Sequence, residues 1–186
     1  NLFTGPLYFL YKIVSTLNMV DRLREKYPHF NFVPVYWMAT EDHDFDEINF
    51  FNFKGQKVQW NQDATGAVGR RSTRGLDEVL GTWSARLDDS VHAKKLIELF
   101  TTSYLEQDLL AEATRFLVNT LFGKDGLVIV DGDDADLKRL LVPYAKKDIF
   151  EKIPFAQVSR SIRLLSQVSD TYKIQVNPRE INYFYL

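Results

Sequence analysis

The stretch VPVYWMATEDHDFDEIN, Val33 to Asn49, joins an apolar run to a dense group of acidic side chains. The run from Val33 to Ala39 is almost continuously apolar rather than alternating, which is typical of a parallel strand that is covered on both faces. Five carboxylates and one imidazole follow it: Glu41, Asp42, His43, Asp44, Asp46 and Glu47. The stretch therefore predicts a buried strand with a charged loop at its carboxyl end.

A second stretch has the same pattern. GLVIVDGDDADL, Gly126 to Leu137, predicts a strand at 127–130 and then an acidic turn into a helix at about 135–150. Between the two strands, the sequence has helical patterns at about 76–87, 90–105 and 108–122, the last ending at Gly123 as a stop signal. Strands that alternate with helices in this way indicate an α/β fold, an open parallel sheet with crossover helices.

The remaining segments surround this sheet. A helix is predicted from Pro6, a favourable first helical residue, to Pro28, and another near 155–168. FFNFKGQKVQW, residues 50–60, predicts a hairpin that turns at Lys54 and Gly55, and a polar, glycine-containing loop follows at 61–75. We expect extended segments at 172–176 and 181–186.

Composition limits the functions that the chain can have. It has 186 residues, of which 45% are hydrophobic, a net charge of -2 and no cysteine. Such a chain can bury a core, and its scattered basic residues disfavour a nucleic-acid partner. No apolar run approaches the roughly 20 residues that span a bilayer, and no secretion signal is present, so we expect a cytoplasmic protein without a membrane partner. Asn1 in place of Met, and an apolar final segment, lead us to expect a fragment of a longer protein.

The two acidic groups follow strands, which is where an open α/β sheet binds its ligands. We therefore expect Asp42, His43 and Asp131 to line one cleft. An imidazole between two acids suits proton transfer, cation binding or recognition of a substrate amine.

Helix capping is the alternative interpretation of both groups, because aspartates at a helix start satisfy free amides and complement the helix dipole. It is the stronger interpretation for Asp133, Asp134 and Asp136. It is the weaker one for Asp42 to Asp44, where a histidine gains nothing from a helix N-terminus.

Two further segments are candidate anion sites. In GAVGRRSTRG, residues 66–75, glycines allow close backbone approach and arginines such as Arg70 can pair with an anion, although a mobile solvated linker explains the segment equally well. In FTGP, Thr4 and Gly5 precede a helix, where outward amides can bind a phosphate or carboxylate. The alternative there is simple N-capping by Thr4.

Five segments, in order along the whole chain, carry a family resemblance: LFTGPLYFLYK, VYWMATEDHDFDEIN, GAVGR, LFGKDGLVIVDGDDADLKRL and QVNPREINYFYL. Together they resemble the bacillithiol-biosynthesis cysteine-adding enzymes, a family of cysteine ligases. The resemblance implies that 1–186 is part of a Rossmann-like catalytic domain, incomplete at both ends, with a hairpin and loop insertion at about 50–75. The core is similar to that of class I aminoacyl-tRNA synthetases, but the His-Ile-Gly-His and Lys-Met-Ser-Lys-Ser signatures of those enzymes are absent from this chain.

The reaction that the resemblance implies joins cysteine to the amine of glucosaminyl malate and gives bacillithiol. ATP is then the expected co-substrate, with Mg²⁺ as a candidate companion ion, while zinc is not expected because cysteine ligands are absent. The resemblance also implies a longer parent, with a Gly-Gln-Gln stretch before residue 1 and a coiled coil after residue 186. A homodimer formed through those parts is a candidate assembly.

Amide formation needs an activated carboxylate and a general base for the attacking amine. We expect His43 or Asp42 to act as the base or to grip the ammonium of cysteine, with Asp44 orienting the imidazole. The expected substrate- and nucleotide-binding residues hold phosphate, a malyl carboxylate, a ribose hydroxyl or Mg²⁺: Thr4, Gly5, Glu41, Arg70 and Asp131. We expect no metal held by protein ligands alone.

Two other classes of function stay open. A Mg²⁺-dependent phosphohydrolase would use Asp42, Asp44 and Asp131 as oxygen ligands and would hydrolyse a generic phosphoester without cysteine. A non-catalytic nucleotide-binding module would bind ATP, or only itself, without turnover.

Overall fold

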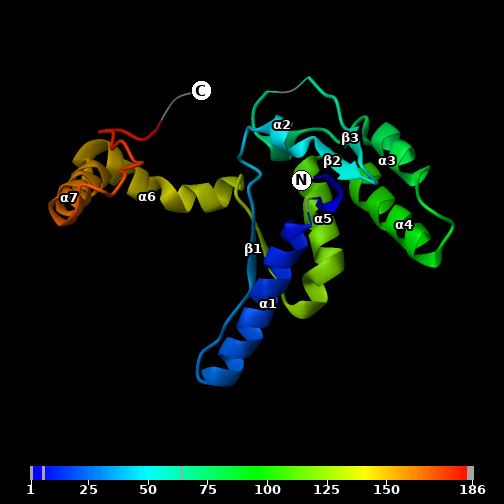
Figure 1. Cartoon of the computed structure of the whole chain (residues 1–186), viewed down its shortest axis with the longest axis horizontal. Helices are drawn as coiled ribbons and strands as arrows, with labels where there is room; N and C mark the ends of the chain where they lie inside the picture. Colours follow the sequence, from blue (N-terminus) through cyan, green and yellow to red (C-terminus); the bar gives the residue numbers. More distant parts are fainter. Residues whose placement is uncertain (1, 6, 64, 184–186) are drawn as a thin grey trace. The chain divides into compact units, whose positions relative to one another are not determined.

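The computed structural model describes residues 2–5, 7–63 and 65–183, and it divides the chain into two compact units, 1–133 and 134–186 (Figure 1). The first unit contains the strands and the larger hydrophobic core. Each unit is described by itself.

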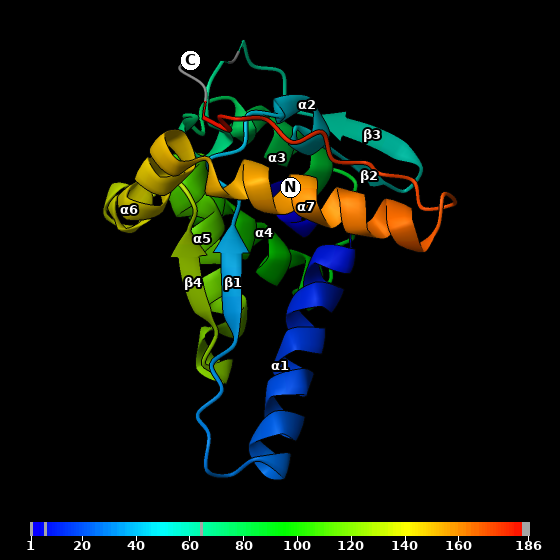
Figure 2. The same ribbon diagram turned by 90° about the vertical axis from the view of Figure 1, so that its left-hand side faces the viewer.

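A parallel pair of strands lies in the first unit. β1 (Val35–Met38) pairs with β4 (Val128–Asp131) in a register that sets Val35 opposite Val128 and Met38 opposite Asp131. The two strands lie side by side in Figure 2. The chain between them forms helices α2 to α5, so the predicted α/β fold with a parallel sheet and crossover helices is confirmed.

The sequence predicted that β1 is covered on both faces. Within the first unit this prediction is wrong. Met38 is 1% exposed, whereas Val35 and Trp37, on the opposite face of the same strand, are 50% and 57% exposed. Helices α1 and α5 pack against the face that carries Tyr36 and Ile129. Among the described residues of the first unit, no element covers the other face.

Helix α1 (Tyr8–Lys26) confirms the predicted N-terminal helix, although it starts after the proposed first position, Pro6, which lies outside the described residues. It buries Ile13 and Val20, and Ile13 packs with Val118 of α5 (Leu110–Phe122). The C-terminal stop of α5 differs from the prediction, because Gly123 keeps a helical φ of -59° and a short 3-10 turn, η3 (Gly123–Asp125), follows. The glycine with a left-handed backbone conformation is Gly126, which follows η3 and has a φ of 76°.

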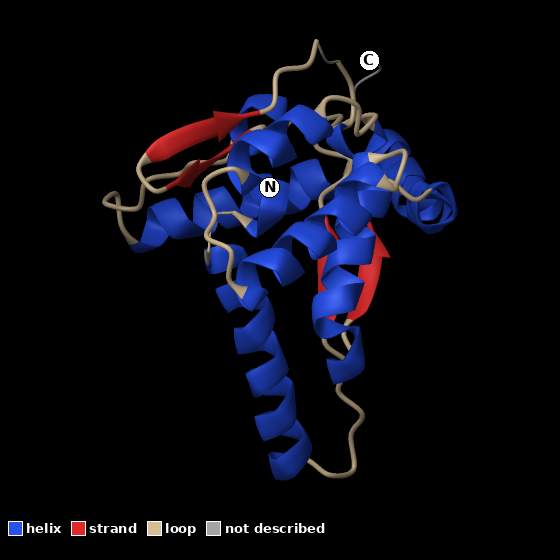
Figure 3. Cartoon of the chain, turned by 90° about the vertical axis from the view of Figure 1, so that its right-hand side faces the viewer, coloured by secondary structure: helices blue, strands red, loops and turns tan. Residues whose placement is uncertain are grey.

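The predicted hairpin is confirmed. After a single-turn helix, α2 (Phe45–Ile48), strands β2 (Phe50–Phe53) and β3 (Gln56–Gln59) pair antiparallel and form a sheet separate from β1 and β4 (Figure 3). Lys54 and Gly55 both have positive φ, 48° and 75°, as a two-residue turn that matches the twist of the strands requires.

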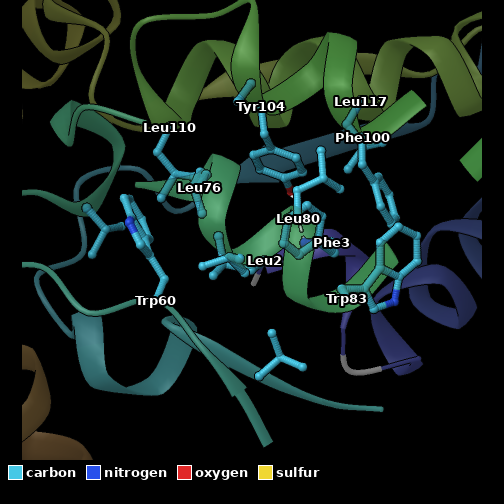
Figure 4. Packing of buried hydrophobic residues seen from close by; sticks show 14 of the residues in the cluster. Leu2, Phe3, Trp60, Leu76, Leu80, Trp83, Phe100, Tyr104, Leu110 and Leu117 are labelled. Carbon is cyan, nitrogen blue, oxygen red and sulfur yellow. Dashed lines mark hydrogen bonds between the residues drawn. The ribbon is translucent and has the colours of Figure 1, made fainter. Parts of the chain in front are cut away.

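Helices α3 (Leu76–Ser84), α4 (Val91–Leu105) and α5 confirm three predicted helices and enclose the main core. Phe3, which precedes α1, reaches into this core. Its ring centroid lies 4.8 Å from that of Tyr104, and its amide donates a hydrogen bond to the Tyr104 hydroxyl at 3.1 Å (Figure 4). The N-terminal segment is therefore anchored by aromatic packing.

The second unit contains α6 (Ala135–Glu151) and α7 (Ile153–Val168), which confirm the last two predicted helices. Residues 172–176 and 181–183 form no strand, and 184–186 lie outside the described residues. Side chains hold this end instead: Asn182 donates to the Asp148 carboxylate at 3.2 Å, and Lys152 pairs with Glu180 at 2.7 Å. Nowhere in the described ranges is a helix long and apolar enough to cross a membrane.

Candidate active site at the carboxyl end of strand β1

A cavity of about 500 Å³ lies in the first unit between α1, β1, α2 and the start of α5. Its apolar part is formed by side chains such as Phe9, Ile13 and Met38. Its polar part carries one ammonium and three carboxylates, those of Lys12, Asp42, Asp44 and Glu47.

Tyr36 lines the same cavity from β1. Burial raises the pKa of its hydroxyl from 10.0 to about 12, because the phenolate would lose its hydration there. Tyr36 therefore contributes a neutral hydroxyl group over the physiological range of pH.

The loop after β1 is held in a defined shape by its own hydrogen bonds. Oδ1 of Asp42 accepts the amides of His43 at 2.7 Å and Asp44 at 3.3 Å. This local turn uses one oxygen of Asp42 on the backbone and fixes where the chain leaves the strand.

A short 3-10 turn, η2 (Val68–Arg70), holds this loop from outside. The amide of Val68 donates to the carbonyl of Asp42 at 2.7 Å, and that of Gly69 donates to the carbonyl of Thr40 at 2.9 Å. A Cβ on Gly69 would lie 2.5 Å from the Cβ of Thr40, so only glycine allows this approach.

His43 lies beside the cavity rather than in it. Its side chain is 89% exposed, and its Nδ1 is 3.7 Å from Oδ1 of Asp42. The carboxylate nearest the imidazole is thus Asp42, and the structure does not show the expected orienting contact from Asp44.

Asp131 faces a second cavity, of about 710 Å³, between β4 and α5. Its carboxylate accepts a hydrogen bond from the Thr40 hydroxyl and another from Arg115 Nη2, at 3.2 Å. The amide of Asp133 lies 3.0 Å from both the Thr40 hydroxyl and Asp131 Oδ1. Asp42 lines the first cavity, Asp131 lines the second and His43 lines neither, so the three side chains do not line one cleft as predicted.

Arg70 pairs with an aspartate of the chain itself. Its guanidinium makes a two-point contact with Asp133, from Nε to Oδ2 and from Nη2 to Oδ1, the second at 3.0 Å, and this pairing raises the pKa of Arg70. Of the acids expected to cap the next helix, Asp134 does so, accepting the amides of Asp136 and Leu137 at 2.9 Å. The capping interpretation thus holds for Asp134, and Asp133 binds Arg70.

The interpretation of 66–75 as a solvated linker is wrong for its central part. Val68, Arg71 and Thr73 are buried, and the Arg71 guanidinium lies 4.0 Å from the ring centroid of Phe45. Burial lowers the pKa of Arg71. The central part of the segment 66–75 therefore belongs to the core. It is buried because η2 packs closely against the loop that follows β1.

Thr4 and Gly5 line neither cavity. The N-cap position of α1 is Leu7, without a side-chain cap, so Thr4 does not cap the helix either. Thr4 has a φ of 62° at the end of η1 (Leu2–Thr4), and a Cβ on Gly5 would lie 3.2 Å from that of Phe51. Phe3 to Gly5 pack on the core because the Phe3 ring is anchored there.

Glu41 also lies outside both cavities. Its Oε1 accepts the indole N–H of Trp37 at 3.4 Å. Its carboxylate lies against the backbone of Gly132, where an added Cβ would be only 2.0 Å from Oε2.

Three functional candidates were missed by the sequence reasoning: Lys12, Thr40 and Glu47. For Lys12 a signal exists, since it lies at helical spacing from Phe9, Ile13 and Thr16, which line the same cavity. Thr40 has no comparable signal, because its partner Asp131 is 91 positions away.

No group of three His, Asp or Glu side chains that could hold a metal ion forms within residues 2–5, 7–63 and 65–183. Asp42 and Asp44 line one cavity and Asp131 lines the other. The ligand set of a Mg²⁺-dependent phosphohydrolase is therefore not assembled in this part of the chain.

Comparison with known proteins identifies relatives over the whole chain. A family model described as "Bacillithiol biosynthesis BshC, N-terminal Rossmann-like domain" matches residues 1–186. Proteins named "Putative cysteine ligase BshC" from Flavobacterium johnsoniae and Flavobacterium psychrophilum are 56% and 55% identical over 186 residues, which is 100% of this chain and 34% of each relative. One of the same name from Cytophaga hutchinsonii is 40% identical over 98% of the chain and 33% of its own length. The chain thus spans about a third of the length of the curated relatives that it matches.

Proposed function

This chain belongs to the family of the N-terminal Rossmann-like domain of the bacillithiol biosynthesis protein BshC, and we propose that its cavity beside β1 is the substrate site of a cysteine ligase. In the proposed reaction, the carboxylate of cysteine is activated at the expense of ATP and joined to the amine of glucosaminyl malate. The cysteine carboxylate first becomes an acyl-phosphate, with ADP released, or an acyl-adenylate, with pyrophosphate released. The amine then attacks the acyl carbon, the bond from that carbon to the phosphate oxygen breaks, phosphate or AMP leaves, and the amine loses a proton as the amide forms. The relatives named cysteine ligase support the type of reaction.

One observation carries the proposal: carboxylates of Asp42 and Asp44 line an apolar-walled cavity at the carboxyl end of a parallel strand. Ligand sites of open α/β sheets lie at such strand ends. An amine substrate arrives as an ammonium and must lose a proton before it attacks. A carboxylate in the cavity can hold that ammonium and accept its proton.

Asp42 is our candidate for this role, and His43 is the group that exchanges a proton with it. Asp42 lines the cavity, while the exposed imidazole lies 3.7 Å from its Oδ1. A proton taken up by Asp42 can therefore leave through His43. Such contacts often shorten when substrate binds.

The phosphate groups of ATP need donors that Arg70, Thr4 and Gly5 do not offer in this cavity. The first turn of α5 offers them instead, because Leu110, Ala111 and Thr114 line the cavity and helix N-termini favour anions. The amide of Ala111 has no hydrogen-bond partner among the described residues. We therefore propose that the activated group lies near this turn.

The test is ligation of cysteine to glucosaminyl malate by the full-length parent protein with ATP. Asp42→Asn removes the charge but keeps the shape, and we expect turnover to fall about 10²- to 10⁴-fold, the usual effect of losing a general acid or base. His43→Ala should also lower turnover, by less than Asp42→Asn if the imidazole only relays the proton. Both variants should melt like the wild type because both side chains are more than half exposed.

Asp125→Asn is the matched control, since Asp125 is an exposed aspartate of the same unit and lines neither cavity. Near-normal turnover by Asp42→Asn would show that the catalytic carboxylate lies elsewhere. Binding of ATP without any ligation by the wild type would favour the non-catalytic module.

A further inference from the structure

The cavity beside β1 has charges of both signs on different elements. Lys12 comes from α1, Asp42 and Asp44 from the loop after β1, and Glu47 from α2. The fold therefore brings one ammonium and three carboxylates to the wall of a single cavity of about 500 Å³.

These charges are not neutralised by each other. Within the described ranges, no ion pair joins Lys12 to a carboxylate, and its ammonium instead lies over the ring of Tyr8, 5.1 Å from the centroid. Nor does a lysine or arginine of those ranges pair with Asp42, Asp44 or Glu47. A ligand that carries both charges can therefore satisfy both sides of the cavity.

We propose that this cavity is a zwitterion site in which Lys12 binds the carboxylate of the α-amino-acid substrate while the acidic side binds its ammonium. This inference rests on the proposed function and deepens it, because it assigns the orientation of cysteine. An α-amino acid carries a carboxylate and an ammonium on one carbon, so it matches a cavity with separated opposite charges. Lys12 then holds the carboxylate that has to be activated.

The orientation makes Lys12 a specificity residue as well. Cysteamine has the thiol and the ammonium of cysteine but lacks the carboxylate, so it cannot use Lys12. The wild type should prefer cysteine to cysteamine, and a variant without the lysine charge should lose most of this preference.

The experiment uses the full-length parent and measures cysteine and cysteamine binding by calorimetry, with ligation kinetics alongside. Lys12→Met keeps an unbranched side chain that is one atom shorter and removes the charge. We expect its Kd for cysteine to rise about 10- to 100-fold, as for the loss of a hydrogen bond to a charged group, with little change for cysteamine. Lys12→Arg should recover part of the loss.

The chain provides a closely matched control in Lys26. It lies on the same helix, is exposed, and has its ammonium over a tyrosine ring, 5.3 Å from the centroid of Tyr27, but it lines neither cavity. Lys26→Met should bind cysteine like the wild type. Thermal melts of both variants should match that of the wild type, since both lysines are exposed.

Two results would overturn the inference: unchanged cysteine affinity in Lys12→Met, or a loss confined to KM for glucosaminyl malate, which would assign Lys12 to a malyl carboxylate. A third result would distinguish a failure of the proposed function from a failure of this inference. If cysteine binds in a Lys12-dependent way but no ligation occurs with glucosaminyl malate and ATP, the zwitterion site stands and the assigned reaction fails.

Discussion

Tyr36 lines the cavity with its ring against that of Phe9, 5.5 Å between centroids and nearly perpendicular to it. Because burial raises its pKa from 10.0 to about 12, the folded protein favours the protonated hydroxyl more than the unfolded chain does. The stabilisation that this difference provides is complete below about pH 10 and is lost as the pH rises through about 12. The cavity wall should therefore be sensitive to alkali.

We expect Tyr36→Phe to reduce the alkaline loss of stability. Between about pH 9 and about pH 11, the free energy of unfolding of the wild type should fall by about 1 kcal/mol more than that of the variant, from the linkage of one group. Urea unfolding of the full-length parent at a series of pH values measures this. Tyr11→Phe, at a position 64% exposed, is the control and should behave as the wild type. Parallel pH profiles of wild type and Tyr36→Phe would contradict the assigned cause.

The contact between η2 and the end of β1 positions the acidic loop, and it depends on a glycine. Gly69→Ala places a Cβ 2.5 Å from the Cβ of Thr40 and 3.0 Å from its carbonyl oxygen. We expect a loss of about 1 to 3 kcal/mol in the free energy of unfolding, as for overpacking, and lower ligation because the loop that carries Asp42 moves.

Gly81→Ala is the control for this prediction, and it should change stability in the opposite direction. Gly81 lies inside α3, and a Cβ there would meet nothing within 4 Å. This variant should gain about 0.5 to 1 kcal/mol through helix propensity. Equal stability of the two alanine variants in chemical denaturation would show that the close approach at Gly69 is unimportant.

The longer helices and the four strands were predictable because their signals are local, whereas the single-turn helix α2 was not predicted. Apolar periodicity defined α1, α4 and α5, and Lys54 with Gly55 marked the turn of the hairpin. The candidate site was predictable only in its location, at the end of β1. The contacts that orient its side chains join distant residues, 91 positions apart for Thr40 and Asp131 and 63 for Arg70 and Asp133. No local pattern shows that Asp131 is held by Thr40 and Arg115, or that Arg70 already has a partner.

The exposed face of β1 was also beyond prediction, for a different reason. A continuous apolar run indicates a strand that is covered on both faces, but the described elements of the first unit cover only one face of β1. A parallel sheet with one open face and two strands is not expected to be stable by itself. Since the curated relatives are about three times as long as this chain, the activity experiments belong on the full-length parent.

The central claim is that the cavity between α1, β1, α2 and the start of α5 binds the amino-acid substrate. A crystal structure of the full-length parent with cysteine tests it most directly. We expect cysteine in this cavity, with its carboxylate within hydrogen-bond distance of Lys12 Nζ and its ammonium against Asp44 or Glu47. The same electron density in crystals of the Lys12→Met variant should be weak or absent. Cysteine bound at any other place on the protein, with this cavity holding only solvent, would contradict the account.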